Sequence, residues 1–561
     1  MSYGKNKLIN NALRRSYALI DYNVHNDTHK RYKFQKQTLL DDESLTKKEK
    51  SEAIRIITKS YDEEKIVHNK GTKRICENCN QECLAITYCE LCVRNYLKAK
   101  FSSWTSGNDN IDNLIQECQM KTLAPRLIPE WIPYNNLQNI KYLAKGGFSE
   151  IYTAVWIEGT YEEWDSKEQQ LKRFGSQIIV LKKLENVENA NQNWFEEARS
   201  HLNISNKWNE VVQCYGLTQD PSNGNYMLVM NKLDTDLRKY LQQNHNQLTW
   251  KERIQIAIDI INALEKIHYE NEIHRDLHSG NILFRSRFRI SDLGFCGPAA
   301  KPLKSIYGNL PYIAPEVIIG REQTFKSDIY SIAMLMWEIS SGQPPFNNFE
   351  HDYDLAMNIV NGIRPKIIPG TPLEYKNLMK QCWDADPSKR SDIFTLRRKM
   401  GDINLFYQTK SSELSQLEEN NNFEVENHTG SSKLFTSKLH QFDNLPEPRN
   451  ATEEEQEAFH SNKSYNFHIP DNIDDFNKSS SKKNSTSKIN SIFKAAKSHP
   501  IYLKEAQKMA NIQNDFKIET MQQQVKKLHN NDDDEDEVHN NLNLHSKEQD
   551  ELELPDSKNY F

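Results

Sequence analysis

Residues 273–284, which read IHRDLHSGNILF, place a carboxylate and a side-chain amide five positions apart between two apolar ends. Asp276 could accept a proton there, and Asn281 could offer an amide oxygen to a cation. A second carboxylate, Asp292, follows in the stretch ISDLGF. Two carboxylates and an amide on neighbouring turns suit a hard divalent cation, which prefers oxygen ligands. On its own the stretch is as easily a polar loop between two strands, so its chemistry depends on what accompanies it.

A basic residue that could pair with such acids lies upstream, because the apolar strand pattern IIVLKKL carries Lys182. The helical pattern NWFEEARSHL follows and carries Glu197, with Glu196 as the alternative one residue earlier. An ordinary lysine on an edge strand is the simpler interpretation of Lys182 alone. Chance does not easily produce all of these residues in this order along one globular stretch.

These stretches, in this order, resemble the catalytic parts of a protein kinase, with H-R-D-L-x-x-x-N at the loop and D-L-G in place of D-F-G. The resemblance covers residues 137–402, and YLAKGGFSEIYTAVW stands where that family has its glycine-rich loop. The stretches TWKERIQIAIDIINALEKIH and MWEISSGQPPF are most similar to the tyrosine-kinase-like group, whose members mostly phosphorylate Ser or Thr. The domain also resembles a large set of kinase-like proteins of arbuscular mycorrhizal fungi. The implied fold class is α+β and bilobal, with a small β-rich N-lobe and a larger helical C-lobe.

The resemblance also implies roles for the site residues. Asp276 would orient the hydroxyl of a protein substrate and accept its proton. Lys182, paired with Glu197, would hold the α- and β-phosphates of ATP, and Asn281 and Asp292 would bind Mg²⁺. The implied activity is transfer of the ATP γ-phosphate to protein hydroxyls in intracellular signalling.

A nucleotide pocket is implied in the same way. Gly146 keeps the middle glycine of the loop, whereas Ala144 and Ser149 replace the first and third glycines with other small residues. Met230 would be the gatekeeper, although a methionine at this place is equally an ordinary core residue. The residues that we expect around ATP are Leu143, Gly146, Gly147, Phe148, Ile151, Val180, Lys182, Met230, Asn231, Leu233 and Leu283.

Departures from the kinase pattern bear on activity. His278 stands where Ser/Thr kinases usually carry a lysine that contacts the γ-phosphate, and an imidazole is shorter than a lysine side chain. Asn309 stands where threonine is usual, but it can still hydrogen-bond Asp276. We expect an active Ser/Thr kinase. The alternative is a pseudokinase or adaptor that binds nucleotide and partners without significant phosphotransfer.

The activation segment between Asp292 and the stretch LPYIAPEV resembles that of a kinase as well. Glu316 in this stretch would form a buried ion pair with Arg390. The hydroxyls before the stretch belong to Ser305 and Tyr307, and a phosphate on either could pair with Arg275. The other interpretation is that the segment is ordered without modification.

Five of the nine cysteines lie in the stretch CENCNQECLAITYCELC. Two C-x₂-C pairs can form two knuckles that share one Zn²⁺ ion through Cys76, Cys79, Cys89 and Cys92. The spacing between the pairs is shorter than in common zinc ribbons, so Cys83 is an alternative ligand. Buried or free thiols are the other interpretation. So short a segment cannot build a core by itself, which favours a metal, and the module would be structural or would bind a protein partner.

Composition divides the 561 residues into five regions. Residues 1–70 are polar and partly helical, and form either a solvated lead-in or a partner-binding helix. Residues 71–100 hold the cysteines, and the prolines at the end of the connector 101–136 suggest an extended linker. Residues 137–402 have a globular composition. Residues 403–561 are low-complexity sequence, which we expect to be largely disordered. A weak helical pattern around Met509, Ile512 and Phe516 could bind a protein partner, with transient helix as the favoured interpretation.

Charge and hydropathy narrow the class of partner. The net charge of −6 is small for this length and no basic patch stands out, so we expect neither a nucleic-acid nor a membrane partner. The N-terminus lacks the apolar core of a signal peptide, and the clustered cysteines suit a reducing compartment. We therefore expect a cytoplasmic protein, with the nucleus as an alternative, whose ligands are ATP, Mg²⁺, Zn²⁺ and protein substrates.

Overall fold

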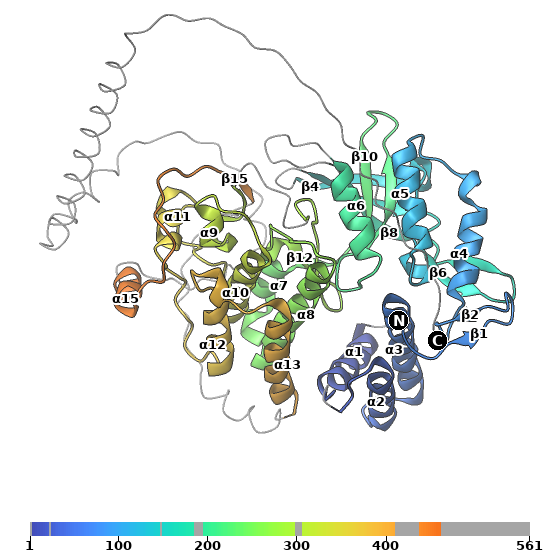
Figure 1. Ribbon diagram of the computed structural model, residues 1–561, viewed down its shortest axis with the longest axis horizontal. Helices are drawn as coiled ribbons and strands as arrows, with labels where there is room; N and C mark the ends of the chain where they lie inside the picture. Colours follow the sequence, from blue (N-terminus) through green and yellow to red (C-terminus); the bar gives the residue numbers. More distant parts are fainter. Residues whose placement is uncertain are drawn as a thin grey trace, which may run out of the picture. The chain divides into compact units, whose positions relative to one another are not determined.

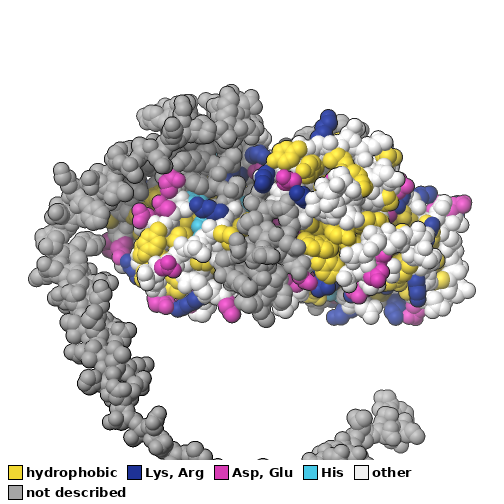
Figure 2. Space-filling view, turned by 90° about the horizontal axis from the view of Figure 1, so that it is seen from above, with side chains coloured by type: hydrophobic (Ala, Val, Ile, Leu, Met, Phe, Trp, Pro, Cys, Tyr) yellow, Lys and Arg dark blue, Asp and Glu magenta, His cyan; other side chains and the backbone are white. Residues whose placement is uncertain are grey.

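The computed structural model describes residues 3–21, 24–145, 149–184, 194–297, 306–409 and 437–461 (Figure 1). All of these residues belong to one compact unit. Within them, no helix combines the length and the hydropathy that a membrane span needs. On the face drawn in Figure 2, lysine and arginine side chains are interspersed with aspartate and glutamate.

The N-terminal region is a packed helical unit and differs from a solvated lead-in. Its helix α3 begins at a capping box, in which Thr46 and Glu49 each bond the other's backbone N–H. Leu39, Ala53 and Ile57 lie in a small apolar core that the helices of this region share. The helices described here are α1 (Tyr3–Ala18), α2 (Thr28–Asp41) and α3 (Lys47–His68).

The cysteine-rich module follows as a hairpin of β1 (Arg74–Ile75) and β2 (Glu82–Cys83), and then α4 (Glu90–Ala99). Asp62 of α3 anchors it, because this fully buried carboxylate accepts the backbone N–H groups of Ile86 and Thr87 at 2.7 and 2.9 Å. A buried carboxylate that satisfies two backbone donors is a stabilising contact, so the module and the helices form one structure.

The connector is not a free linker. Its Leu127 and Ile132 are buried, and β3 pairs in parallel with a strand of the N-lobe sheet at Gly216. A Cβ on Gly216 would lie 1.8 Å from the carbonyl oxygen of Glu130, so only glycine fits there. The prolines do exclude a long helix over residues 123–134, but the apolar residues between them bury the segment. The connector contains η1 (Phe101–Ser103), α5 (Asp109–Met120), η2 (Pro125–Leu127), β3 (Glu130–Trp131) and η3 (Tyr134–Asn136).

The N-lobe is a six-stranded sheet in the order β3-β9-β10-β8-β5-β4, and every neighbouring pair except β3 with β9 is antiparallel. Helix α6 (Trp194–Ser205) contributes Ala198 and Leu202 to an apolar cluster with β9 and β10. The longer strands are β4 (Leu137–Lys145), β5 (Glu150–Trp156), β8 (Gln177–Lys183), β9 (Cys214–Gln219) and β10 (Tyr226–Asn231).

The polar insert after β5 forms its own hairpin, β6 (Tyr161–Asp165) and β7 (Gln170–Arg173). Trp164 and Leu171 of this hairpin are buried in one apolar cluster with the cysteine-rich module. Trp164 also meets Tyr96 of α4 edge-on, with the ring centroids 5.6 Å apart. Arg173 pairs with Glu130 of β3 at 2.6 Å. The insert therefore joins the cysteine-rich module to the N-lobe.

The C-lobe is largely helical, and α10 is buried from Ser327 to Ser341. The bilobal α+β fold that the kinase resemblance implied is confirmed. The C-lobe helices and turns are α7 (Leu237–Asn244), η5 (His245–Gln247), α8 (Trp250–Tyr269), η6 (Ser279–Asn281), η7 (Leu310–Tyr312), α9 (Pro315–Ile318), α10 (Phe325–Ser341), α11 (Tyr353–Val360), α12 (Leu373–Cys382), η8 (Pro387–Lys389) and α13 (Ile393–Thr409). Its short strands are β11 (Thr235–Asp236), β12 (Ile282–Phe284), β13 (Phe288–Ile290) and β14 (Ile306–Gly308).

Residues 437–461, which we call the tail segment, are ordered against the C-lobe, within the region 403–561 that we expected to be largely disordered. The tail segment contains β15 (Lys438–His440), which pairs with β14, and α15 (Glu453–Ser461). Phe459 of α15 stacks on Phe349 with the ring centroids 5.3 Å apart. Composition averaged over residues 403–561 is polar and does not reveal that the short tail segment has apolar and hydrogen-bonding residues that anchor it.

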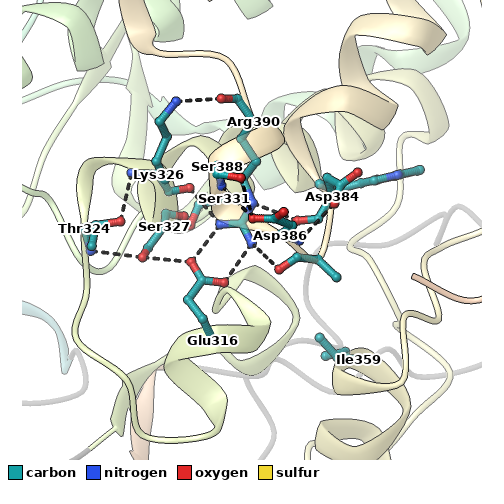
Figure 3. A network of polar contacts seen from close by, with 12 residues as sticks. Glu316, Thr324, Lys326, Ser327, Ser331, Ile359, Asp384, Asp386, Ser388 and Arg390 are labelled. Atoms are coloured by element: carbon teal, nitrogen blue, oxygen red, sulfur yellow. Dashed lines mark hydrogen bonds and ion pairs between the residues drawn. The ribbon is translucent and has the colours of Figure 1, made fainter. Parts of the chain in front are cut away.

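A buried ion pair ties η8 to α9 (Figure 3). Arg390 donates to both carboxylate oxygens of Glu316 at 2.7 Å, and the two side chains are 0% and 5% exposed. The other guanidinium N–H groups bond the carbonyls of Asp384, Ala385 and Lys326, so its five donors are satisfied. The ion pair expected from the sequence is confirmed.

We expect Arg390→Gln to lower the free energy of unfolding by about 3–5 kcal/mol, because it leaves the Glu316 charge buried without its partner. Urea denaturation followed by tryptophan fluorescence measures this change. Lys389→Gln, at the exposed neighbouring position, is the matched control and should change the value by less than about 0.5 kcal/mol. Equal effects for the two variants would contradict the prediction.

Candidate active site

Three charged side chains from separate elements meet at the end of β8. The Nζ atom of Lys182 lies 2.6 Å from Glu197 Oε1 on α6 and 2.6 Å from Asp292 Oδ1. The Lys182 and Glu197 side chains are 7% and 1% exposed, on an inner strand of the sheet, so the edge-strand interpretation of Lys182 is wrong. Glu196 pairs instead with Arg199 on the exposed side of the helix at 2.9 Å.

The ion pairs keep Lys182 and Asp292 charged. Burial opposes the charge of Asp292, but the Lys182 ammonium outweighs it and holds the pKa of this carboxyl well below its usual range. Burial also opposes the charge of Lys182, whereas Asp292 and Glu197 together raise its pKa above its usual range. Asp292 has a left-handed backbone with a φ of 60°, a conformation that stores strain in a residue other than glycine.

His201 belongs to this site, and the sequence analysis missed it. It lies one helical turn after Glu197, and its Nε2 accepts the backbone N–H of Leu293 at 3.2 Å. Its spacing of four residues from Glu197 was the available signal, since such positions share one face of a helix. Burial, followed by the nearby Lys182 cation, lowers the pKa of His201 to about 3, so the imidazole stays a neutral acceptor.

The backbone of the loop 273–284 is hydrogen-bonded to a buried carboxylate of α10. Asp328 accepts the N–H of His274 at 2.8 Å and that of Arg275 at 3.0 Å. Arg275 has a φ of 70°, so this anchor holds a strained residue directly before Asp276. The N–H of Asp276 in turn donates to His274 Nδ1 at 3.3 Å. The position of Asp276 is therefore set by backbone contacts on its N-terminal side.

The oxygen donors that we expect to bind Mg²⁺ come from neighbouring segments. Asn281 donates through Nδ2 to the Asp276 carbonyl at 2.9 Å, which leaves its amide oxygen to ligate a cation. The N–H of Ser291 donates to the Asn281 carbonyl at 2.8 Å, and this bond fixes the start of the turn that carries Asp292. An amide oxygen and a carboxylate that is 38% exposed fit a hard divalent cation that keeps several waters.

The register of the N-lobe sheet aligns the residues that we expect around adenine. Val180 of β8 lies opposite Met230 of β10, and Ile151 of β5 lies opposite Lys182. Met230 is buried, whereas Ile151, Val180 and Asn231 are half-buried. Val180 and its partner Met230 thus lie two residues along the strands from the lysine that we expect to hold phosphate, and Ile151 lies directly opposite this lysine.

The remaining pocket residues lie on both lobes. Leu233 and Leu283 are half-buried and pack against the same apolar cluster as Met230. Leu143 of β4 is 53% exposed, which leaves its side chain available to a ligand. The expected loop residues Gly146, Gly147 and Phe148 lie outside the described residues.

Tyr307 of the activation segment is packed rather than presented to a kinase. Its side chain is 5% exposed and stacks on Phe295 with the ring centroids 3.9 Å apart. Arg275, the expected phosphate partner, donates to the Phe295 carbonyl at 2.9 Å. Ser305, the other candidate, lies outside the described residues. This packing favours a segment that is ordered without modification of Tyr307.

The tail segment reaches Asp276 from a position 161 residues away in sequence. Ser437 Oγ donates to Asp276 Oδ1 at 2.8 Å and lies 3.1 Å from His278 Nε2. The N–H of Gly280 donates to His278 Nδ1 at 3.1 Å, which assigns the proton of the imidazole to Nε2, from where it can donate to Ser437 Oγ. A carboxylate and an imidazole thus hold one serine hydroxyl between them.

Four of the clustered cysteines converge on one point. The Sγ atoms of Cys76, Cys79, Cys89 and Cys92 all lie within 4.8 Å of one another, with separations of 3.7 Å and 3.8 Å for two of the pairs. Thiolates at about 2.3 Å from a tetrahedral Zn²⁺ lie about 3.8 Å apart, so the arrangement fits this ion. Cys83 is buried outside the group of four.

Comparisons with known proteins agree on one part of the chain. Residues 137–400 match the family model for protein tyrosine and serine/threonine kinases. The chain is 35% identical over 170 residues to a dual serine/threonine and tyrosine protein kinase of Homo sapiens, which is 29% of this chain and 18% of that protein. It is 26% identical over 339 residues to the probable serine/threonine-protein kinase roco5 of Dictyostelium discoideum, which is 55% of this chain and 11% of that protein. The chain thus spans only a minor part of the relatives that it matches.

The buried histidine predicts a dependence of stability on pH. Below a pH of about 6.5 the unfolded chain protonates His201, whereas the folded chain does so only near pH 3. The free energy of unfolding therefore falls as the pH drops through this window, by up to about 1.4 kcal/mol per pH unit from this residue. His201→Gln keeps an acceptor but removes the titration.

We expect His201→Gln to reduce the slope of the free energy of unfolding against pH between about pH 6 and pH 5. The reduction should approach the limit of about 1.4 kcal/mol per pH unit that one titrating group can contribute. Urea denaturation without nucleotide at each pH gives the slope, and measurement at about pH 8 gives the separate cost of the substitution. A slope equal to that of the unsubstituted chain would contradict the prediction.

Proposed function

We propose, on the premise that residues 137–400 form a protein kinase domain, that the chain transfers the γ-phosphate of ATP to serine or threonine hydroxyls of proteins. The observation that carries this proposal is the hydrogen bond from the hydroxyl of Ser437 to Asp276. A carboxylate that accepts the proton of a serine hydroxyl is arranged as the base for phosphoryl transfer to such a group. The names of the relatives, which cover serine/threonine and dual specificity, support this reaction and a domain of the tyrosine-kinase-like type.

The residues of the site would act as follows. Lys182 would remain oriented by Glu197. When nucleotide binds, its ammonium group would exchange the ion pair with Asp292 for contacts to the phosphate oxygens of ATP. Asn281 and Asp292 would hold Mg²⁺, which supplies positive charge to the phosphates when it is bound. Asp276 would orient the substrate hydroxyl and take its proton.

His278 bears on the choice of acceptor. Its Nε2–H donates to the same hydroxyl oxygen whose proton points to Asp276. The pair fixes the hydroxyl by one donor and one acceptor, so we assign His278 to positioning of the acceptor. This role replaces the phosphate contact that a lysine has at this place in most Ser/Thr kinases.

The alternative is a pseudokinase or adaptor, which the replacements Ala144, Ser149 and His278 suggest. The two functions differ in one observable, because a pseudokinase can bind nucleotide but transfers no phosphate. The ion pairs of Lys182 and the oxygen donors of Asn281 and Asp292 favour the enzyme.

We expect Asp276→Asn to lower phosphate transfer by about 10²- to 10⁴-fold, because the amide cannot accept the hydroxyl proton. Mg-ATP and a mixture of Ser, Thr and Tyr peptides serve as substrates, and binding of a fluorescent ATP analogue reports the pocket. Asp402→Asn, at an exposed position on α13, is the matched control and should keep full activity. Nucleotide binding without transfer by the unsubstituted chain would establish the alternative.

We also propose that Cys76, Cys79, Cys89 and Cys92 hold a structural Zn²⁺ ion. Each strand of the module's hairpin is only two residues long. So short a segment needs a cross-link such as a metal ion to stabilise its fold. The apolar cluster that the module shares with Trp164 and Leu171 would depend on it. Thiolate ligands require reduced cysteines, which agrees with the expected intracellular location.

Metal analysis of the purified full chain should find about one zinc per chain. We expect Cys92→Ser to lower this content severalfold, because a hydroxyl is a poor zinc ligand, and Cys83→Ser to retain it. Equal loss in both variants would place Cys83 among the ligands. Absence of zinc in the unsubstituted chain would leave the four cysteines as buried or free thiols.

A further inference from the structure

We propose that Ser437 is a phosphoacceptor of the chain's own kinase site, modified within the same molecule. This inference rests on the proposed function, and it names the first substrate of that site. Ser437 is 8% exposed, and its hydroxyl lies between the carboxylate of Asp276 and the imidazole of His278. A hydroxyl held in this way occupies the place of an acceptor.

The backbone around Ser437 is bound as an extended peptide. Residues Lys438–His440 form β15, which pairs antiparallel with β14 of the activation segment, with Lys438 opposite Gly308 and His440 opposite Ile306. Addition of a strand to an existing edge is a common way to bind a peptide, since main-chain hydrogen bonds give affinity and side-chain pockets give specificity. Ser437 is the residue directly before this strand.

The side chains that follow Ser437 fit their surroundings. Leu439 packs against the stacked rings of Phe295 and Tyr307. His440 is 6% exposed, lies with Nε2 3.0 Å from the Gly308 carbonyl, and stacks on Phe442 with the ring centroids 5.5 Å apart. The activation segment thus recognises the chain on the C-terminal side of the serine.

Further anchors hold the tail segment to the C-lobe. The side chain of Asn450 accepts the Ala385 N–H at 2.9 Å and donates to Asp384 at 3.0 Å. Gln456 donates to the Gly362 carbonyl at 2.7 Å and accepts the Arg364 N–H at 3.2 Å. These contacts keep Ser437 at a high effective concentration at the site, which favours reaction within one molecule.

The reaction balances with Mg-ATP as the second substrate. The Oγ atom of Ser437 forms a bond to the γ-phosphorus of ATP, and the bond from that phosphorus to the β–γ bridging oxygen breaks. ADP leaves with the electron pair of that bond, and the hydroxyl proton passes to Asp276. The products are phosphoserine 437 and ADP.

The modification would also free the site. Asp276 is 6% exposed and its Oδ1 accepts the Ser437 hydroxyl, so the bound tail segment occupies the position of an external substrate hydroxyl. A phosphoserine carries about 1.5 to 2 negative charges at pH 7 and would lie beside the Asp276 carboxylate. Repulsion between them would release the tail segment from β14.

The test uses the full chain, treated first with phosphatase, then incubated with Mg-ATP and a Ser/Thr peptide mixture. Mass spectrometry should find phosphate at Ser437, with a rate per molecule that does not change when the protein is diluted about tenfold. Isotope-labelled Asp276→Asn chain, mixed in as an acceptor, should gain less than about a tenth of that phosphate. Peptide phosphorylation should accelerate as Ser437 is modified, and Ser437→Ala should remove this acceleration.

Two control variants separate the proposal from simpler explanations. Thr436→Ala removes the neighbouring hydroxyl and should leave the phosphate at Ser437 unchanged. Asn450→Ala combined with Gln456→Ala weakens the anchors far from the base, so it should slow Ser437 modification severalfold and speed the early phosphorylation of peptide.

Each other outcome counts against the proposal. Peptide phosphorylation with Ser437 unmodified overturns the inference and leaves the proposed function in place. Phosphate at Thr436 alone, or at Ser437 of the labelled acceptor chain with a rate that rises with concentration, overturns modification within one molecule. Phosphate on neither peptide nor tail, despite nucleotide binding, overturns the proposed function and the inference with it.

Discussion

One buried cation decides how the site is built. The Lys182 ammonium is almost fully enclosed, and a single unpaired charge in such a place would be very costly. Glu197 from α6 and Asp292 from the C-lobe each approach it to 2.6 Å, so the two lobes are joined through the lysine. His201 supports this arrangement, because it holds the backbone after Asp292 and remains neutral beside the cation. The positions of α6, of β8 and of the loop that carries Asp292 relative to one another are therefore those that bring two carboxylates to this one ammonium group.

A second set of buried carboxylates holds the backbone on which the chemistry depends. Asp328 accepts backbone N–H groups of the loop before Asp276, and Glu316 pairs with Arg390 behind the activation segment. These groups touch no reacting atom. Asp328, for example, holds Arg275 in a left-handed backbone conformation. Without this support, the loop would relax to a conformation of lower strain.

Segments before and after residues 137–402 pack against the N-lobe and the C-lobe. The cysteine-rich module shares its apolar cluster with Trp164 of the insert, so the insert has a structural partner. The connector adds β3 to the N-lobe sheet, and the tail segment adds β15 to the activation segment. In both additions a strand forms at an edge where main-chain groups need partners, which is a general way for a peptide to bind.

The sequence alone determined the four cysteines by their spacing, and through its resemblance to protein kinases it indicated the fold class and the order of Lys182, Glu197 and Asp292 along the chain. Even the ion pair of Glu316 with Arg390 followed from such motifs. Only the tertiary structure decided what lies against Asp276. Ser437 has no motif of its own, and it reaches the base across 161 residues through strand pairing and anchors spread over the C-lobe. Contacts of that kind depend on the folded surface of two distant segments, which local composition and periodicity do not encode.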